Sequence, residues 1–128
     1  MASSGGGIFA SASAAVLINN SIVARNGETA LARGRDVYGT VQSQGYNLIG
    51  ASNDSSGWIA SDILGTASDP VDPRLGALQD NGGATFTQAL LPDSPAIAAG
   101  DPALLGTYDQ RGVLRQGAVD IGAFETAP

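Results

Sequence analysis

The run Ile18-Asn19-Asn20-Ser21-Ile22-Val23-Ala24 returns as Gln44-Gly45-Tyr46-Asn47-Leu48-Ile49-Gly50, 26 residues later. Polar and aliphatic positions largely coincide in the two copies. A period of this length is typical of one coil of a solenoid, in which short strands stack on equivalent strands and bury small and aliphatic side chains. The repeat therefore predicts β-solenoid coils. Two unrelated hairpins are the alternative, because Asn26-Gly27 is also a hairpin signal.

A second alignment extends the repeat toward the N-terminus. Ile8-Phe9-Ala10 aligns with Val37-Tyr38-Gly39 at a spacing of 29 residues, so a three-residue insertion is expected within Asn26–Arg35. Turns absorb such insertions easily. We therefore expect about two recognisable coils within residues 1–50.

The period disappears after Gly50, where Ser, Asp, Gly and Pro become frequent. Residues 51–68 are expected to form a loop insertion. Asp-Pro pairs at 69–70 and 72–73 make a continuous helix improbable, because proline fixes its own backbone and pushes the preceding residue toward extended conformations. Short strands are expected to return around Thr85–Leu91, Ala96–Ala98 and Ala118–Phe124.

The second half carries a distinctive set of blocks. They are Asp72-Pro73-Arg74-Leu75-Gly76-Ala77-Leu78-Gln79-Asp80-Asn81-Gly82-Gly83-Ala84-Thr85-Phe86-Thr87, then Ala89-Leu90-Leu91-Pro92-Asp93-Ser94-Pro95-Ala96-Ile97, Gly100-Asp101, Asp109-Gln110-Arg111-Gly112 and Asp120-Ile121-Gly122-Ala123-Phe124-Glu125. Together they resemble the C-terminal segment of bacterial parallel β-helix surface proteins of the choice-of-anchor Q type. Val119 stands where that family often has Cys, and Ala98 where it often has an acid.

The resemblance implies an all-β, right-handed parallel β-helix of the pectate-lyase-like class, secreted or held at the bacterial cell surface. Residues 69–128 would then be a loop-rich capping segment of the same domain. A solenoid end exposes unpaired strand edges that must be covered. The first coil, Ile8–Ile22, lacks an evident cap, so we expect self-association into a homo-oligomer through it.

Composition narrows the chemistry. Twelve acids against six arginines, without lysine, histidine or cysteine, give a net charge of −6. Nucleic acid is therefore not expected as a partner, and histidine-based catalysis, cysteine chemistry and disulfides are excluded. Membrane insertion is not expected either, since no apolar run approaches the length of a bilayer span. No catalytic residue is identified.

Three sets of residues are candidate sites. Asp54, Asp62, Asp69 and Asp72 could bind calcium through carboxylates, although capping of turns is the favoured interpretation. Asp109, Arg111, Arg115 and Asp120 could bind an acidic sugar, but are expected to form a charge-paired structural lock. Trp58, Tyr46 and Tyr108 are candidates for stacking on sugar rings. For Trp58 the favoured interpretation is a plug that packs over the coil interior.

The leading expectation is a non-catalytic terminal segment of an exported β-helix protein, which caps the solenoid and supports adhesion. A carbohydrate-binding module that takes a polysaccharide is the second interpretation, and a fragment of a polysaccharide lyase or hydrolase is the third. No cofactor is expected, calcium apart.

Overall fold

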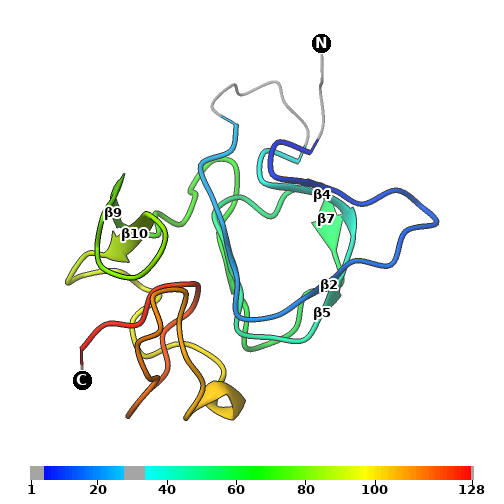
Figure 1. Ribbon diagram of the computed structural model, residues 1–128. Coiled ribbons are helices and arrows are strands. Elements are labelled where there is room, and N and C mark those ends of the chain that lie inside the picture. The colour runs from blue at the N-terminus through cyan, green and yellow to red at the C-terminus, as the bar shows by residue number, and fades with distance from the viewer. Residues whose placement is uncertain (1–4, 28–33, 128) are drawn as a thin grey trace. The chain divides into compact units, whose positions relative to one another are not determined.

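The computed structural model describes residues 5–27 and 34–127 (Figure 1). The described residues form short strands and one single-turn 3₁₀ helix, so the fold is all-β as expected. The elements are β1 (Ile8–Phe9), β2 (Leu17–Ile18), β3 (Ile22–Val23), β4 (Val37–Thr40), β5 (Gln42–Ser43), β6 (Leu48–Ile49), β7 (Ser55–Ser56), β8 (Ile63–Leu64), β9 (Leu75–Gln79), β10 (Thr87–Leu90) and η1 (Pro102–Leu104). They belong to two compact units, Met1–Asp72 and Pro73–Pro128.

The first unit consists of parallel sheets with the strand orders β1-β4-β7, β2-β5 and β3-β6-β8. The chain passes through the three sheets in turn and then returns to the first, so each pass pairs with the one before it. In Figure 1 the blue, cyan and green passes overlie one another around a three-sided outline. Ile8 pairs with Val37, and Ile22 pairs with Leu48. The two sequence alignments therefore give the register of these two sheets, whereas in the β2-β5 sheet Ile18 pairs with Ser43, one residue from its aligned partner Gln44.

The segment expected to be a loop insertion, 51–68, contains two strands instead. β7 pairs in parallel with β4, and β8 pairs in parallel with β6. Gly39 pairs with Ser55 and Leu48 with Ile63, so this third pass is much shorter than the second. The prediction of a plain loop was wrong. The connections between strands are shorter in the third pass, so this pass does not repeat at the spacing by which the first two passes could be recognised.

Small residues allow the passes to approach one another. Gly39 has φ +94°, and a Cβ there would lie 2.1 Å from the carbonyl oxygen of Ala10 in the preceding pass. Gly57 has the same φ, and its Cβ would lie 1.9 Å from the carbonyl oxygen of Val41. Only glycine fits such positions, because it lacks a Cβ and tolerates positive φ.

The core of the first unit lies between the sheets. Val37, Val41 and Ile49 are buried with Ala10 and Ile18 in one apolar cluster. Ile8, Val16, Val23 and Trp58 pack against it from the side.

A buried amide links all three passes. Asn47 is fully buried, and its Nδ2 donates to Ile18 O at 3.2 Å and to Asp62 Oδ1 at 2.9 Å. Its Oδ1 accepts from the backbone N–H of Ser21 at 3.0 Å. The side chain therefore satisfies backbone groups where the chain turns between strands, which is the usual requirement for buried polar groups.

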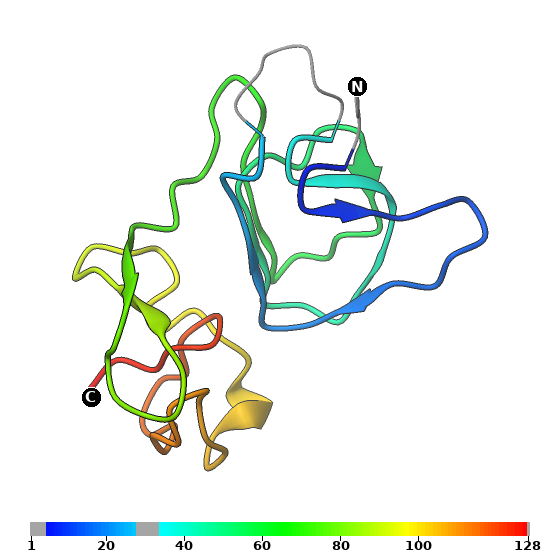
Figure 2. The ribbon, with the colours of Figure 1, turned by 45° about the horizontal axis from the view of Figure 1, so that its top comes forward.

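The second unit has little regular structure. β9 and β10 pair antiparallel with an irregularity between Gln88 and Leu90 (Figure 2). β10 agrees with the strand expected at Thr85–Leu91. The strands expected at Ala96–Ala98 and Ala118–Phe124 are absent from the described structure, where these segments are held mainly by turns. They still lie side by side, since Ile121 N donates to Ala96 O at 2.9 Å.

No helix in the described part of the chain has the length and apolar character needed to cross a bilayer.

Candidate functional site

The second unit is organised around a group that we call the charge cluster, formed by Asp109, Arg111, Arg115, Asp120 and Glu125. The four residues of the expected lock come together in it. Arg115 is 6% exposed, and its Nη1 donates to Glu125 Oε2 at 2.7 Å. Its other hydrogen bonds go to the carbonyl oxygens of Asp120 and Gly122. Arg115 thus holds the returning C-terminal chain through three acceptors.

Arg111 and Asp109 form the second ion pair of the cluster. Two nitrogens of Arg111, Nε and Nη2, donate to Asp109 Oδ2 at 3.0 and 2.8 Å. Nη2 also donates to Glu125 O, and the guanidinium lies 3.5 Å from the centroid of the Phe124 ring. Such a planar cation over an aromatic face adds electrostatic attraction to the packing. Arg111 therefore fixes the Phe124-Glu125 segment from two sides.

The carboxylates of Asp109 and Asp120 accept from backbone amides. Asp109 accepts from the N–H groups of Arg111, Val113 and Glu125. Asp120, only 1% exposed, accepts from Ala98 N at 2.7 Å and from Thr126. These bonds join segments that share no strand ladder, so the carboxylates replace missing backbone pairing.

The charge cluster differs from the expected lock in one member. Glu125 is 3% exposed and is the direct partner of Arg115, yet it was not named as a site residue. It stood within the terminal block of the family resemblance, which is the signal that could have found it. Because the donors and acceptors of the charge cluster bond to groups of the protein itself, the cluster is suited to a structural role and poorly suited to binding an acidic sugar.

The electrostatics of Asp109 follow from this geometry. Burial by itself raises the pKa of the carboxyl, but hydrogen bonds from the backbone of Glu125 and Val113 and from Arg111 outweigh it. The pKa of Asp109 therefore lies below the usual value of an aspartate. The carboxylate is held in its charged form, as a structural ion pair requires.

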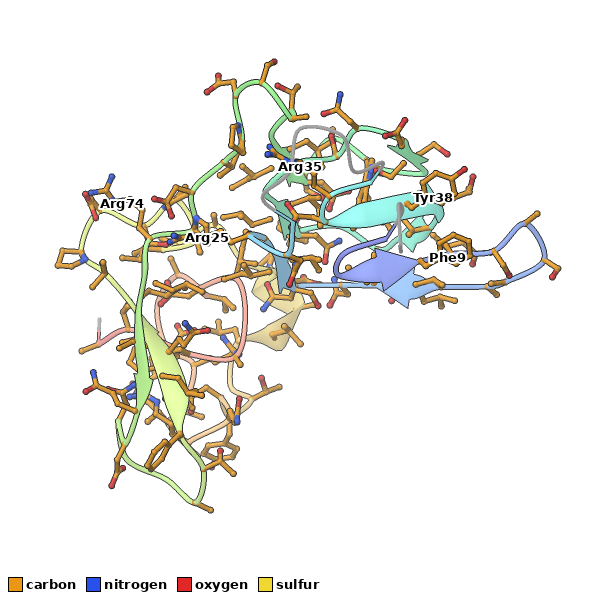
Figure 3. All side chains as sticks on the ribbon, turned by 90° about the horizontal axis from the view of Figure 1, so that it is seen from above. Phe9, Arg25, Arg35, Tyr38 and Arg74 are labelled. Carbon is orange, nitrogen blue, oxygen red and sulfur yellow. The ribbon has the colours of Figure 1, made fainter. Side chains whose placement is uncertain are left out.

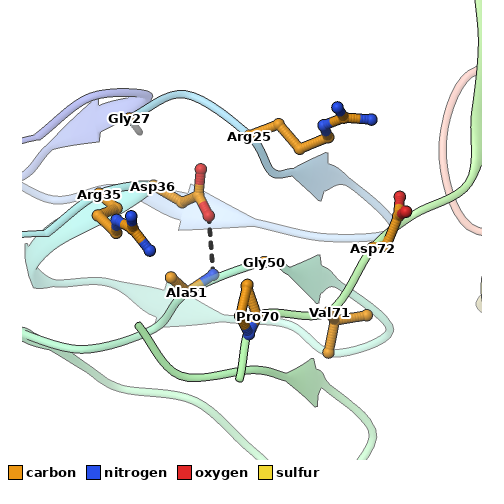
Figure 4. A pocket seen from close by; sticks show the side chains of 9 residues that line it. All are labelled: Arg25, Gly27, Arg35, Asp36, Gly50, Ala51, Pro70, Val71 and Asp72. Carbon is orange, nitrogen blue, oxygen red and sulfur yellow. Dashed lines mark hydrogen bonds between the residues drawn. The ribbon is translucent and has the colours of Figure 1, made fainter. Parts of the chain in front are cut away.

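The first unit has a pocket of about 320 Å³ near the ends of its first two passes (Figure 4). Its lining is Arg25, Gly27, Arg35, Asp36, Gly50, Ala51, Pro70, Val71 and Asp72. Asp36 is buried and accepts from Ala51 N at 2.7 Å and from Asn26 N at 2.9 Å. Both of its oxygens thus serve the backbone of neighbouring passes. The arrangement supports a structural role for Asp36 and provides no nucleophile paired with a base.

The four acids proposed for calcium binding do not converge. Within residues 5–27 and 34–127, no three acidic side chains gather in a group that could hold a metal ion. Asp54 Oδ2 accepts from Gly34 N, whereas Asp69 lies in a turn with Thr66. Asp72 belongs to the lining of the pocket described above.

Asp62, the remaining acid of the four, holds a corner of the first unit. It accepts from Ser43 Oγ at 2.6 Å, from Ile59 N at 2.8 Å and from both nitrogens of Asn47. Burial raises its pKa, and these hydrogen bonds together bring the pKa below the usual aspartate value. The turn-capping interpretation fits Asp62 well.

The three aromatic candidates do not share one unit. Trp58 is half-buried against the core, and its Nε1 donates to Ser55 Oγ at 2.9 Å, as a plug would. Tyr46 is half-buried in the same unit, whereas Tyr108 belongs to the second unit and is 68% exposed. A different pair forms a stack: the rings of Phe9 and Tyr38 lie 5.3 Å apart and 5° from parallel. The repeat alignment had placed these two residues over each other, which was the available signal.

Comparisons of the chain with models of protein families, with curated protein sequences and with solved structures each yield no match.

Proposed function

We propose that the chain is the C-terminal end of a right-handed parallel β-helix from an exported bacterial surface protein of the choice-of-anchor Q type. The observation that carries the proposal is the register of the first unit. Equivalent residues of successive passes are parallel partners, as in Phe9 with Tyr38 and Val23 with Ile49. Parallel crossover connections are right-handed in nearly all proteins, which supports that hand.

The end of the parallel rows supports a terminal position. In the described structure the sheets finish at β7, β5 and β8, and the next paired element is the antiparallel hairpin β9–β10. An antiparallel hairpin does not continue a parallel row. The last strands of a solenoid present unpaired N–H and C=O groups, which invite association unless they are covered. The second unit is the proposed cover.

The charge cluster supports a structural role for this cover. It gathers residues of the last two blocks of the family resemblance, and its arginines bond to acceptors within the same unit. Ion-pair networks of this kind commonly serve structure. We propose a non-catalytic part, exported to the cell surface, that caps the solenoid and contributes to adhesion.

Carbohydrate binding is the second candidate, and the Phe9–Tyr38 stack is the observation that favours it. A polysaccharide lyase or hydrolase fragment stays the third interpretation, with no residue pair assigned to its chemistry.

A spin label tests the placement of the cap. The chain contains no cysteine, so a single Leu64→Cys label on β8, a side chain that is 41% exposed, reports on the last pass alone. Leu17→Cys on β2, 58% exposed, is the matched label in the first pass. If the second unit is the cover, the label at position 64 should broaden amide signals of residues 73–127 more strongly than the label at position 17. Equal effects, or none, would contradict the capping role.

A further inference from the structure

The outer face of the β1-β4-β7 sheet carries a ladder of rings that stops after two steps. β4 is the central strand, and Tyr38 on it stacks against Phe9 on β1 (Figure 3). The ring spacing of 5.3 Å is close to the spacing of neighbouring strands, as expected when rings project from adjacent strands in register. The two rings therefore follow the sheet.

The next strand in the row supplies small polar residues. β7 places Ser55 opposite Gly39 and Ser56 opposite Thr40. The side chain of Asp54 bonds to Gly34 N. A hollow of about 360 Å³ results, lined by Tyr38, Gly39, Thr40, Asp54, Ser55 and Ser56. Since Phe9 lies on the β1 side of Tyr38, the ring of Tyr38 has Phe9 on one side and the hollow on the β7 side.

We propose that this hollow binds a pyranose ring of a neutral polysaccharide. An aromatic face is an apolar platform, and the apolar face of a sugar ring can lie on it as the next step of the ladder. The hollow is near the lower end of the usual size of ligand sites, which suits one sugar ring at a time.

The polar side of the hollow supplies the hydrogen bonds that a sugar needs. Thr40 Oγ1 and Ser56 Oγ are exposed and lie 2.9 Å apart, so the pair can exchange bonds with ring hydroxyls. The carboxylate of Asp54 adds an acceptor. A purely aromatic ligand would leave these groups without use.

The charge of the hollow selects among sugars. Its only charged lining residue is the acid Asp54, and the chain carries a net charge of −6. Like charges repel, so uronate and sulfated sugars are disfavoured there. The proposal is therefore restricted to neutral hexose or pentose polymers. It differs from the site expected at Trp58, Tyr46 and Tyr108, and it does not depend on the capping role of the second unit.

The test uses nuclear magnetic resonance titration of the full chain with β-1,4-linked hexamers of glucose, mannose and xylose, and with a galacturonate hexamer. We expect at least one neutral hexamer to shift the amide signals of Tyr38, Thr40 and Ser56. The galacturonate hexamer should bind more weakly. No shift in this row with any neutral hexamer at millimolar concentration would overturn the proposal, as would preferential binding of galacturonate.

Variants distinguish the contribution of the Tyr38 ring to binding from an effect of unfolding. Tyr38→Phe should keep the affinity within a few-fold because the ring face persists, and Tyr38→Leu should lose about tenfold because the flat face disappears. Ser56→Phe places a bulky side chain in the hollow and should abolish binding, while Trp58 fluorescence reports that the unit stays folded. Tyr108→Ala, an exposed ring of the other unit, is the matched control and should bind like the parent. Unchanged affinity in both Tyr38→Leu and Ser56→Phe would refute the site.

Discussion

Replacement of Arg115 by Met removes the most buried cation of the second unit while keeping much of the length of the side chain. Three acceptors lose a hydrogen bond from Arg115: Glu125 Oε2, Asp120 O and Gly122 O. Glu125, 3% exposed, then retains the backbone N–H of Asp120 as a donor to the same oxygen. Because the substitution leaves a buried charge without its counter-ion, we expect a loss of about 3–5 kcal/mol in the free energy of unfolding.

That loss is large compared with the free energy of unfolding expected for the second unit. At the usual stability of about 0.05–0.15 kcal/mol per residue, a unit of this length is stabilised by about 3–8 kcal/mol. The Arg115→Met variant should therefore unfold in the second unit for a substantial fraction of molecules. The same substitution at Arg74 is the matched control. Its ion pair with Asp93 has side chains that are 49% and 60% exposed, so a loss below about 1 kcal/mol is expected there.

Amide hydrogen exchange measures the effect unit by unit. Ile121 N and Gly100 N donate to Ala96 O and Val119 O in the second unit, and their protection should fall in Arg115→Met. Trp58, the only tryptophan, reports separately on the first unit. The double variant Arg115→Met/Glu125→Gln removes both charges and should recover part of the loss. Equal protection in Arg115→Met and Arg74→Met would refute the role of the charge cluster.

Three further outcomes are expected. Asp109 has a lowered pKa in the folded state, so the stability that its carboxylate contributes is present above the unfolded-state pKa of about 3.9 and is lost as the pH falls through the folded-state pKa. Acid titration of amide exchange should therefore show a smaller pH dependence in Asp109→Asn than in the parent. Gly39→Ala should destabilise the first unit by at least about 1–3 kcal/mol in urea, monitored by Trp58, whereas Gly27→Ala in the same unit, which lacks a positive φ and whose Cβ would meet its nearest neighbour at 3.2 Å, should destabilise it less. The first pass should mediate concentration-dependent self-association, and Leu17→Lys on the edge strand β2 should reduce it in sedimentation velocity; a parent chain that stays monomeric at high concentration would contradict this.

The repeat in the sequence predicts the registers of β1 with β4 and of β3 with β6, but the register of β2 with β5 differs from the alignment by one residue. Ile22 and Leu48 occupy equivalent places in the two copies, and they are neighbours in the structure. The pattern works because stacked strands bury side chains at the same face, so aliphatic residues must recur wherever a pass faces the core. In the structure the buried amide of Asn47 reinforces this stacking, because at its corner it satisfies backbone groups that no ladder serves.

The third pass could not be predicted by the same reasoning. Ser55 and Ser56 carry no hydrophobic or β-branched signal, and their strand forms because β4 supplies a template. Trp58, which follows β7 in the chain, packs against the apolar core although it lies outside the strand. Local sequence does not predict a strand that forms because it pairs with the edge of a preceding strand.

The pairing of Arg115 with Glu125 was also hidden from the sequence. The two residues are joined by a chain that turns back between them, and no helical or strand period links their positions. Asp109 and Arg111 are easier, because their short separation lets the carboxylate reach both the backbone and the guanidinium of Arg111. Sequence reasoning thus identified the arginines and most of the acids, but not which acid neutralises which arginine.

The second unit explains why acids and glycines dominate the terminal blocks. A unit with one short hairpin has few ladders, so its backbone donors need other acceptors. Asp109 and Asp120 each accept from backbone amides on separate segments, and a neutral amide of the same shape could accept only through one oxygen. Arg111 and Arg115 supply the counter-ions of Asp109 and Glu125, which lowers the cost of burying these two carboxylates. Arg111 and Arg115 are consequences of this irregular backbone, which is why we assign them a structural role within the second unit and look for the ligand on the first unit.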